Sequence, residues 1–224
     1  MKISIVIPTY PPHFCLLETC ISYIMKSTIL PDEIIISASE ITDLIAANLL
    51  LELQKNCNVP IIITGISTVG YAGTNRNAGV LKCNNDIIIF MDADDYMHYQ
   101  KIEIDKTCFE LYPDCKQLLN NSSTNIRDLD NNYDIKNLQF FKYMGDFNKT
   151  SIVTNGMDTI HRGNIAIHKN TFNKIKYSNV MHREDNIFTK KVHKIFNQSY
   201  FIPLKLFIYN ESGIEFKNKY YNAT

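Results

Sequence analysis

Four short, β-branched apolar runs divide the first half of the chain at nearly even intervals: Ile3–Ile7, Ile34–Ile36, Ile61–Ile63 and Ile87–Met91. Each run is continuous rather than alternating, which is typical of strands covered on both faces. Helical patterns fill the gaps, so the sequence predicts strand–helix–strand units and an α/β fold with a Rossmann-like, mostly parallel sheet. The 224 residues, with 45% apolar content, suffice for one compact domain.

The predicted helices rest on apolar side chains that recur at helical spacing. One stripe runs from Leu17 to Ile24, after a pair of prolines that suit a first helical turn. A second repeats every four residues from Ile41 to Leu53, and a third, shorter candidate covers residues 73–83. Later in the chain we expect strands near 152–154 and 164–168, a helix over 184–196 and an alternating strand over 200–208.

The segment from Asn120 to Asp134 is polar and rich in Asn, which predicts a mobile loop between the two halves. Elsewhere the composition excludes several classes of protein. Lys plus Arg equals Asp plus Glu at 23 each, and no basic stripe is visible, so nucleic-acid binding has no support. No apolar run approaches the length of a membrane span.

The six cysteines form no C-x-x-C pair and show no zinc-like spacing. Buried, reduced thiols are the expected state, which favours a cytoplasmic protein. Only the run Ile3–Ile7 precedes Pro8, and it is too short for a secretory signal.

Three aspartates, Asp92, Asp94 and Asp95, directly follow the fourth apolar run. Carboxylates clustered at the end of a buried strand are costly unless something positive binds them. Oxygen-only ligands are typical of a hard divalent cation such as Mn²⁺ or Mg²⁺. The alternative is a solvated acidic turn.

The other unusual segments fall at the ends of neighbouring strands, where open α/β sheets bind their ligands. Pro8, Thr9 and Tyr10 follow the first strand, and Ser39 closes a short polar segment after the second. A glycine-rich segment, 70–79, starts the third helix and contains Arg76, one of only four arginines. Glycines allow close backbone approach, helix starts favour anions, and Arg makes bidentate phosphate contacts. Together with the aspartates they predict a pocket for a nucleoside diphosphate.

Six segments in a fixed order extend these motifs over nearly the whole chain: Ile3–Tyr10, Pro31–Ile36, Gly73–Gly79, Phe90–Asp95, Gly163–Ile167 and Arg183–Phe188. In this order and spacing they resemble the family 2 glycosyltransferases of the GT-A fold. The resemblance implies one GT-A domain over 1–224, in which 1–115 binds a nucleotide sugar and 135–224 an acceptor. It also implies an inverting, metal-dependent transfer from a nucleotide sugar, with a UDP-sugar as the expected donor, to a glycan or glycoconjugate hydroxyl.

The resemblance also implies roles for individual residues. Pro8, Thr9 and Tyr10 would contact the base, usually uridine, and Arg76 would reach the base or the diphosphate. Asp92 would hold the ribose or the metal, and Asp94 would ligate Mn²⁺ or Mg²⁺. At the start of the predicted helix 184–196, Asp185 would be the general base and Glu184 would orient the acceptor. The alternative for this acidic pair is a plain helix N-terminus, which also favours carboxylates.

Two departures from the family pattern stand out. Where relatives have an Asp pair after the second strand, this chain has Ala38 and Ser39, so only a hydroxyl hydrogen bond to the base is expected there. A further ligand, a His that relatives often carry after the last strand, is absent at 209–211. The candidates for a third protein ligand are His161, His168, His182 and His193.

Two other classes of function stay open at this stage. A D-x-D phosphatase of the haloacid-dehalogenase type places its motif after the first strand, whereas three predicted strands precede Asp92 here. A catalytically silent nucleotide-sugar-binding module of the same fold is favoured by Ala38 and Ser39.

Overall fold

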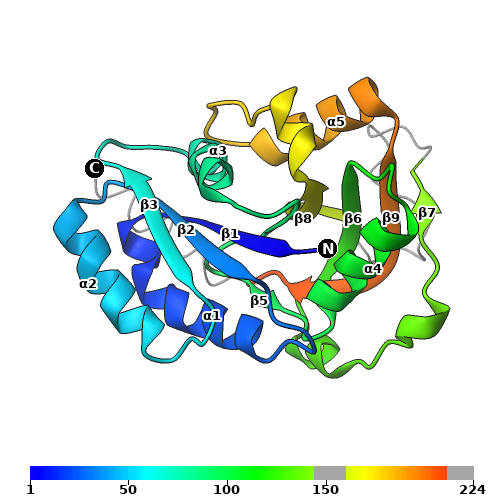
Figure 1. Ribbon diagram of the computed structural model, residues 1–224, viewed down its shortest axis with the longest axis horizontal. Coiled ribbons are helices and arrows are strands. Elements are labelled where there is room, and N and C mark those ends of the chain that lie inside the picture. The colour runs from blue at the N-terminus through cyan, green and yellow to red at the C-terminus, as the bar shows by residue number, and fades with distance from the viewer. Residues whose placement is uncertain (144–159, 211–224) are drawn as a thin grey trace.

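The computed structural model describes residues 1–143 and 160–210. These residues are built on one mixed sheet. Its order is β3-β2-β1-β4-β8-β6-β9-β5, with β7 also paired to β9 (Figure 1). The four predicted strands of the first half lie side by side and parallel, and they are β1 (Ile3–Thr9), β2 (Glu33–Ser39), β3 (Ile61–Ile66) and β4 (Ile87–Phe90).

Alternate residues of the parallel strands point to opposite faces of the sheet, and both faces are buried. Ile5 lies in one apolar cluster and its neighbour Val6 in the other. The first cluster also holds apolar side chains of α1 (Leu17–Met25), α2 (Asp43–Gln54) and α4 (Lys101–Leu111). The second takes side chains from α3 (Ala72–Lys82) and α5 (Glu184–Phe196), which Figure 1 shows together on the opposite side of the sheet. The double covering explains why the strand sequences are continuously apolar.

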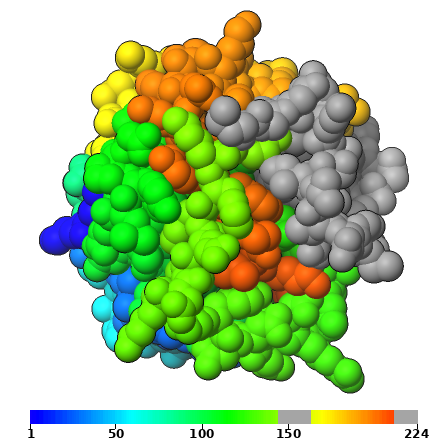
Figure 2. Space-filling model, turned by 90° about the vertical axis from the view of Figure 1, so that its right-hand side faces the viewer, coloured from blue at the N-terminus to red at the C-terminus, as the bar shows by residue number. Residues whose placement is uncertain are grey.

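The second half extends the same sheet with antiparallel and mixed pairs. Its strands are β5 (Tyr96–Met97), β6 (Gln117–Ser123), β7 (Phe141–Lys142), β8 (Ile160–His168) and β9 (Ser199–Ile208). Strand β8 runs antiparallel to β4, and β6 pairs with β8 and β9. The segment that ends in β7 lies across β9, as the light-green and orange atoms in Figure 2 show. Short 3₁₀ helices cover Pro11–Leu16, Ile126–Asp130, Ile135–Asn137 and Lys169–Asn173.

The loop predicted over 120–134 is wrong in its first four residues, because Asn120 to Ser123 belong to β6 in the middle of the sheet. Asn120 is fully buried, and its side-chain oxygen accepts a hydrogen bond from Lys101 Nζ at 2.9 Å. The same Nζ bonds Asp105 at 2.9 Å, and both members of this ion pair are fully buried. Helix α4, which the sequence patterns did not reveal, therefore supplies the buried partner of Asn120.

The other predicted elements are confirmed where the structure describes them. Helix α5 spans the predicted 184–196, and β8 and β9 contain the predicted strands 164–168 and 200–208. The strand expected near 152–154 lies outside the described residues. All six cysteines are free thiols. Five of them are buried, as expected, whereas Cys15 is exposed. In the described part of the chain, no helix combines the length and apolar character that crossing a membrane requires.

Candidate active site

A pocket of about 660 Å³ lies at the carboxyl ends of β1 and β4, between the starts of α3 and α5. It is lined by all of the predicted site residues except Ser39: Pro8, Thr9, Tyr10, Arg76, Asp92, Asp94, Glu184 and Asp185. A volume of this size is in the range of small-molecule and cofactor sites. The residues come from both halves of the chain, so folding joins segments more than 100 residues apart.

The approach of α3 to the sheet depends on small side chains. A Cβ on Gly79 would lie 2.5 Å from Val6 Cγ1, so only glycine lets the helix pack this closely on β1. At the start of the same helix, a Cβ on Gly73 would meet the backbone oxygen of Ser178 at 2.7 Å. Close packing at both positions holds Arg76, midway between them, at the pocket.

Arg76 connects the two acidic groups of the pocket. Its Nη2 lies 2.6 Å from Asp92 Oδ1, and its Nη1 lies 2.7 Å from Glu184 Oε1. Arg76 is only 2% exposed. Burial by itself lowers the pKa of the guanidinium, but the charges of Asp92 and Glu184 outweigh that effect and raise it above its ordinary value. The expected contact of Arg76 with the donor stays a prediction, whereas its role as a bridge between the carboxylates is a feature of the structure.

Tyr177, which no sequence motif singled out, forms the platform under this bridge. The guanidinium carbon of Arg76 lies 5.3 Å from the centre of the Tyr177 ring, within the range of a cation–π contact. The ring stacks on Phe188 with centroids 4.1 Å apart. Asn77 fixes the backbone of Tyr177 from both sides, by a bond to its carbonyl at 3.0 Å and one from its N–H at 2.9 Å. The helix residue next to Arg76 thus anchors the ring on which Arg76 rests.

Asn164 holds the acidic turn in shape from the neighbouring strand β8. Its side-chain oxygen accepts a hydrogen bond from the Asp92 N–H at 2.7 Å, and its amide donates to Asp95 Oδ2 at 2.5 Å. A second donor to Asp95 is the N–H of Asn210, 3.0 Å from Oδ1. Asp95 is 1% exposed and does not line the pocket. Asp92 and Asp94 face the pocket, while Asp95 fastens the turn to the end of β9.

The acidic pair predicted as base and acceptor-orienting group begins α5, and both residues line the pocket. The carboxylate of Glu184 is paired with the guanidinium of Arg76. Asp185 Oδ1 accepts a hydrogen bond from the next N–H of the helix, at Asn186, over 2.6 Å. That bond fixes the direction of the carboxylate. Asp185 is half-buried, so it remains accessible from the pocket.

The donor set fits a divalent cation whose coordination the substrate completes. Mg²⁺ is commonly held by one or two carboxylates together with substrate phosphates, and Asp92 and Asp94 provide that set. Within residues 1–143 and 160–210, no three His, Cys, Asp or Glu side chains converge into a ready-made metal cage. Of the four candidate histidines, His182 lines the pocket, and His168 pairs with Ile87 at the opposite edge of the sheet.

Ser39 does not line the pocket. It is fully buried, and its hydroxyl donates to the Gly70 carbonyl at 3.2 Å and accepts from the Asn75 amide at 3.4 Å. The next residue, Glu40, lines the pocket instead. Sequence reasoning missed Glu40 because its position depends on a backbone conformation that no motif shows.

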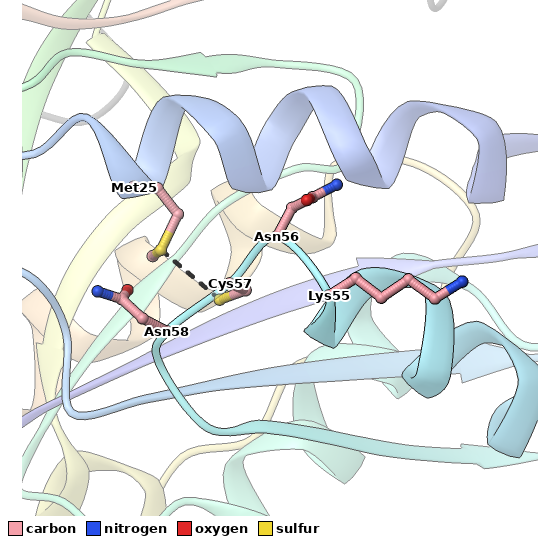
Figure 3. A pocket seen from close by; sticks show the side chains of 5 residues that line it. All are labelled: Met25, Lys55, Asn56, Cys57 and Asn58. Carbon is pink, nitrogen blue, oxygen red and sulfur yellow. Dashed lines mark hydrogen bonds between the residues drawn. The ribbon is translucent and has the colours of Figure 1, made fainter.

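A second pocket, of about 420 Å³, lies between the end of α1 and the loop before β3. Its wall consists of Met25 and residues 55–58, and Cys57 Sγ lies 3.6 Å from Met25 Sδ (Figure 3). These loops precede β2 and β3, so the pocket is at the amino ends of the strands, away from the edge at which such sheets bind ligands.

Sheet order, helix layers and the pocket at the strand ends define a GT-A fold, and known structures agree. TarS residues 1–349 from S. aureus in complex with UDP superpose with a TM-score of 0.69 at 16% identity, over 93% of this chain and 60% of that chain. Mannosyltransferase PcManGT from Pyrobaculum calidifontis, in complex with GDP-Man and Mn²⁺, gives a TM-score of 0.65 at 12% identity, over 93% and 56%.

HddC from Yersinia pseudotuberculosis is similar over almost its whole length, with a TM-score of 0.60, 14% identity and coverage of 98% and 97%. The chain therefore spans about 60% of the TarS structure but nearly all of HddC. The chain has no match among curated proteins.

Residues 4–104 match the family model described as Glycosyl transferase family 2. Over these residues, the chain is similar to the glycosyltransferases of this family. The matched segment includes β1 to β4, the glycine-rich start of α3 and the acidic turn, and thus the donor half of the pocket.

Proposed function

We propose that this protein is an inverting glycosyltransferase that moves a monosaccharide from a nucleotide sugar, with a UDP-sugar as the expected donor, to a hydroxyl of a glycan or glycoconjugate. The observation that carries the proposal is the Arg76 bridge. It fixes Asp92, beside the expected diphosphate position, relative to Glu184, which is adjacent to the expected base. A donor and an acceptor need this fixed relation for direct displacement.

The pocket is acidic, which favours a divalent cation as a partner of the diphosphate. Five carboxylates and two guanidiniums line it among the described residues, and one guanidinium is Arg76. A dianionic leaving group entering alone would be repelled. Mn²⁺ or Mg²⁺ held by Asp92 and Asp94 would supply the positive charge that stabilises the departing diphosphate. The complex of PcManGT with GDP-Man and Mn²⁺ supports this choice.

Asp185 would take the proton from the acceptor hydroxyl while that oxygen forms its bond to the anomeric carbon. The bond from that carbon to the phosphate oxygen breaks, and the diphosphate leaves with the electron pair. Attack from the face opposite the leaving group inverts the anomeric carbon. A positioned base of this kind contributes roughly 10²–10⁴-fold to the rate. A cytoplasmic location stays a prediction.

Three substitutions test the proposal against a silent binding module and against the phosphatase alternative. Asp94→Ala is expected to abolish turnover of a UDP-sugar and to remove the Mn²⁺ dependence of UDP binding. Asp185→Asn is expected to abolish transfer while donor binding, measured by calorimetry, stays unchanged. Transfer retained by Asp185→Asn would refute the base assignment. Hydrolysis of an aryl phosphate that Asp92→Asn abolishes would favour the phosphatase.

A further inference from the structure

Helix α2 exposes apolar side chains on the face that points away from the sheet. Its residues Leu49 and Leu53 are buried in the core cluster. On the opposite side of the helix, Leu44 is 71% and Leu51 67% exposed, and they lie one above the other two turns apart. Ala47, between them, is exposed as well. Figure 1 shows α2 at the outside of the molecule, beside the edge strand β3.

The helix α1, which packs on the same cluster, shows that this exposure is particular to α2. The exposed positions of α1 are polar and include Glu18, Thr19 and Ser22. A helix with apolar side chains on opposite faces is typical of a helix buried within a larger assembly. A contiguous apolar surface with a polar rim is typical of an interaction site. We therefore expect a partner to cover the outer face of α2.

The outer face of α2 has the residue spacing of a two-helix seam. Leu44, Asn48, Leu51 and Lys55 follow one another at intervals of four, three and four residues, as the a and d positions of a coiled coil do. The two leucines provide the apolar contacts. A single Asn within such a seam fixes the register of the helices and limits their number. The pattern thus favours another helix as the partner.

The same face is complementary to itself when two copies meet in opposite directions. An antiparallel pair with its two-fold axis beside Asn48 places Leu44 of each copy against Leu51 of the other. The two Asn48 amides then meet at the axis, where each side chain can donate one hydrogen bond and accept another. Because the axis repeats every contact, two leucine pairs flank one amide pair.

The charges at the two ends of α2 select the same arrangement. Asp43 lies at the amino end and Lys55 at the carboxyl end; both are exposed, and within the described residues neither side chain has an ion-pair partner. In the antiparallel pair, Lys55 comes within about 4.5 Å of the level of the other copy's Asp43 along the helix axis, which a lysine side chain can span. A parallel pair would bring like charges together. Together with Glu52, the face carries net negative charge, which disfavours an anionic membrane surface.

We propose that the outer face of α2 binds a second copy of this chain, so that the protein forms a two-fold symmetric dimer through antiparallel α2 helices. A contact built on one pair of helices is smaller than a standard protein–protein interface, so the dimer belongs to the weak, concentration-dependent class. Dimer formation does not depend on the proposed function, because Leu44 and Leu51 do not line the pocket.

Sedimentation velocity over a series of protein concentrations measures the dissociation constant of the dimer. Leu51→Glu is expected to raise this constant at least about 100-fold, because symmetry places two carboxylates in the apolar contacts. The side chain is exposed in the single chain, so the far-ultraviolet circular dichroism should not change. Leu81→Glu is the matched control: Leu81 is 75% exposed on α3, and its substitution should leave the dissociation constant at the wild-type value.

A charge reversal tests the direction of the two helices. Asp43→Lys and Lys55→Glu should each raise the dissociation constant about 10-fold, because two attractive pairs become repulsive. The double variant should recover the wild-type value, since each reversed charge again meets its opposite. A double variant that does not recover would overturn the antiparallel dimer.

Three other outcomes would also overturn the proposal. They are a wild type that stays monomeric at every concentration, a dimer that Leu51→Glu leaves intact, and a dimer that Leu81→Glu weakens equally. If a monomeric wild type sediments with phosphatidylserine vesicles and Leu51→Glu does not, the face binds a membrane instead.

Discussion

Replacing Arg76 by Met should destabilise the protein strongly, because it leaves two carboxylates facing each other without their cation. Removing one partner of a buried ion pair costs about 3–5 kcal/mol. Asp92 retains 25% and Glu184 11% of side-chain exposure, so water can partly hydrate them and the lower end of this range applies. Loss of the contact with Tyr177 adds about 0.5–1 kcal/mol. We therefore expect a loss of about 3–4 kcal/mol, a large part of a typical stability of about 5–15 kcal/mol.

Equilibrium unfolding in urea measures this loss directly, and a melting temperature lower by about 6–16 °C should accompany it in a chain of this size. The double variant Arg76→Met/Glu184→Gln should be more stable than Arg76→Met alone, since one of the two uncompensated charges is gone. Arg76→Lys should fall between wild type and Arg76→Met, because one ammonium cannot reproduce both arms of the guanidinium fork. A loss below about 1 kcal/mol, typical of surface pairs, would refute the reasoning. So would a double variant no more stable than the single one.

Two further predictions follow from groups around the pocket and in the core. Asn164→Ala should lower the free energy of unfolding, measured in urea, by about 2–4 kcal/mol, because the buried Asp95 loses a hydrogen-bond donor. It should also weaken Mn²⁺-dependent UDP binding, because the Asp92 N–H loses its acceptor. Unchanged UDP binding would show that Asn164 contributes only to the stability of the fold. Burial lowers the pKa of His98 below its ordinary 6.5, with Nδ1 accepting from the Gln100 N–H. The unfolded chain then binds the proton first, so this part of the stability is lost as pH falls below about 6.5; His98→Gln should flatten that slope, and an unaltered slope would contradict the assignment.

Much of the fold could be predicted because continuously apolar strands indicate that both of their faces are buried. A run such as Ile87–Met91 is stable only when covered on both faces, and helices at the right spacing were present to cover it. Strand β6 could not be predicted in the same way. Asn120 is polar, and its place in the core depends on Lys101, a residue 19 positions earlier whose side chain turns inward. Composition records the polarity of a segment but not the partner that satisfies it.

The same distinction between local patterns and long-range contacts applies to the candidate site. Residues at or just after the ends of strands, such as Thr9 and Asp92, could be placed in the pocket because parallel strands end at one edge of the sheet. Contacts between residues far apart in the sequence could not be predicted. The Arg76–Glu184 bridge joins positions 108 residues apart, and the burial of Ser39 depends on the close passage of Gly70. Both required the folded chain.

The acidic turn shows why a motif alone does not assign roles. Asp92, Asp94 and Asp95 are chemically identical, yet the fold gives them different environments. Asp92 is paired with a buried guanidinium, Asp94 lines the pocket, and Asp95 is sealed beneath it by two N–H donors. Burial, followed by the charges of its two neighbours, raises the pKa of Asp95 well above its usual range. Asp95 is buried and already accepts two hydrogen bonds, so the turn presents Asp92 and Asp94 to the pocket while Asp95 holds the turn to the sheet.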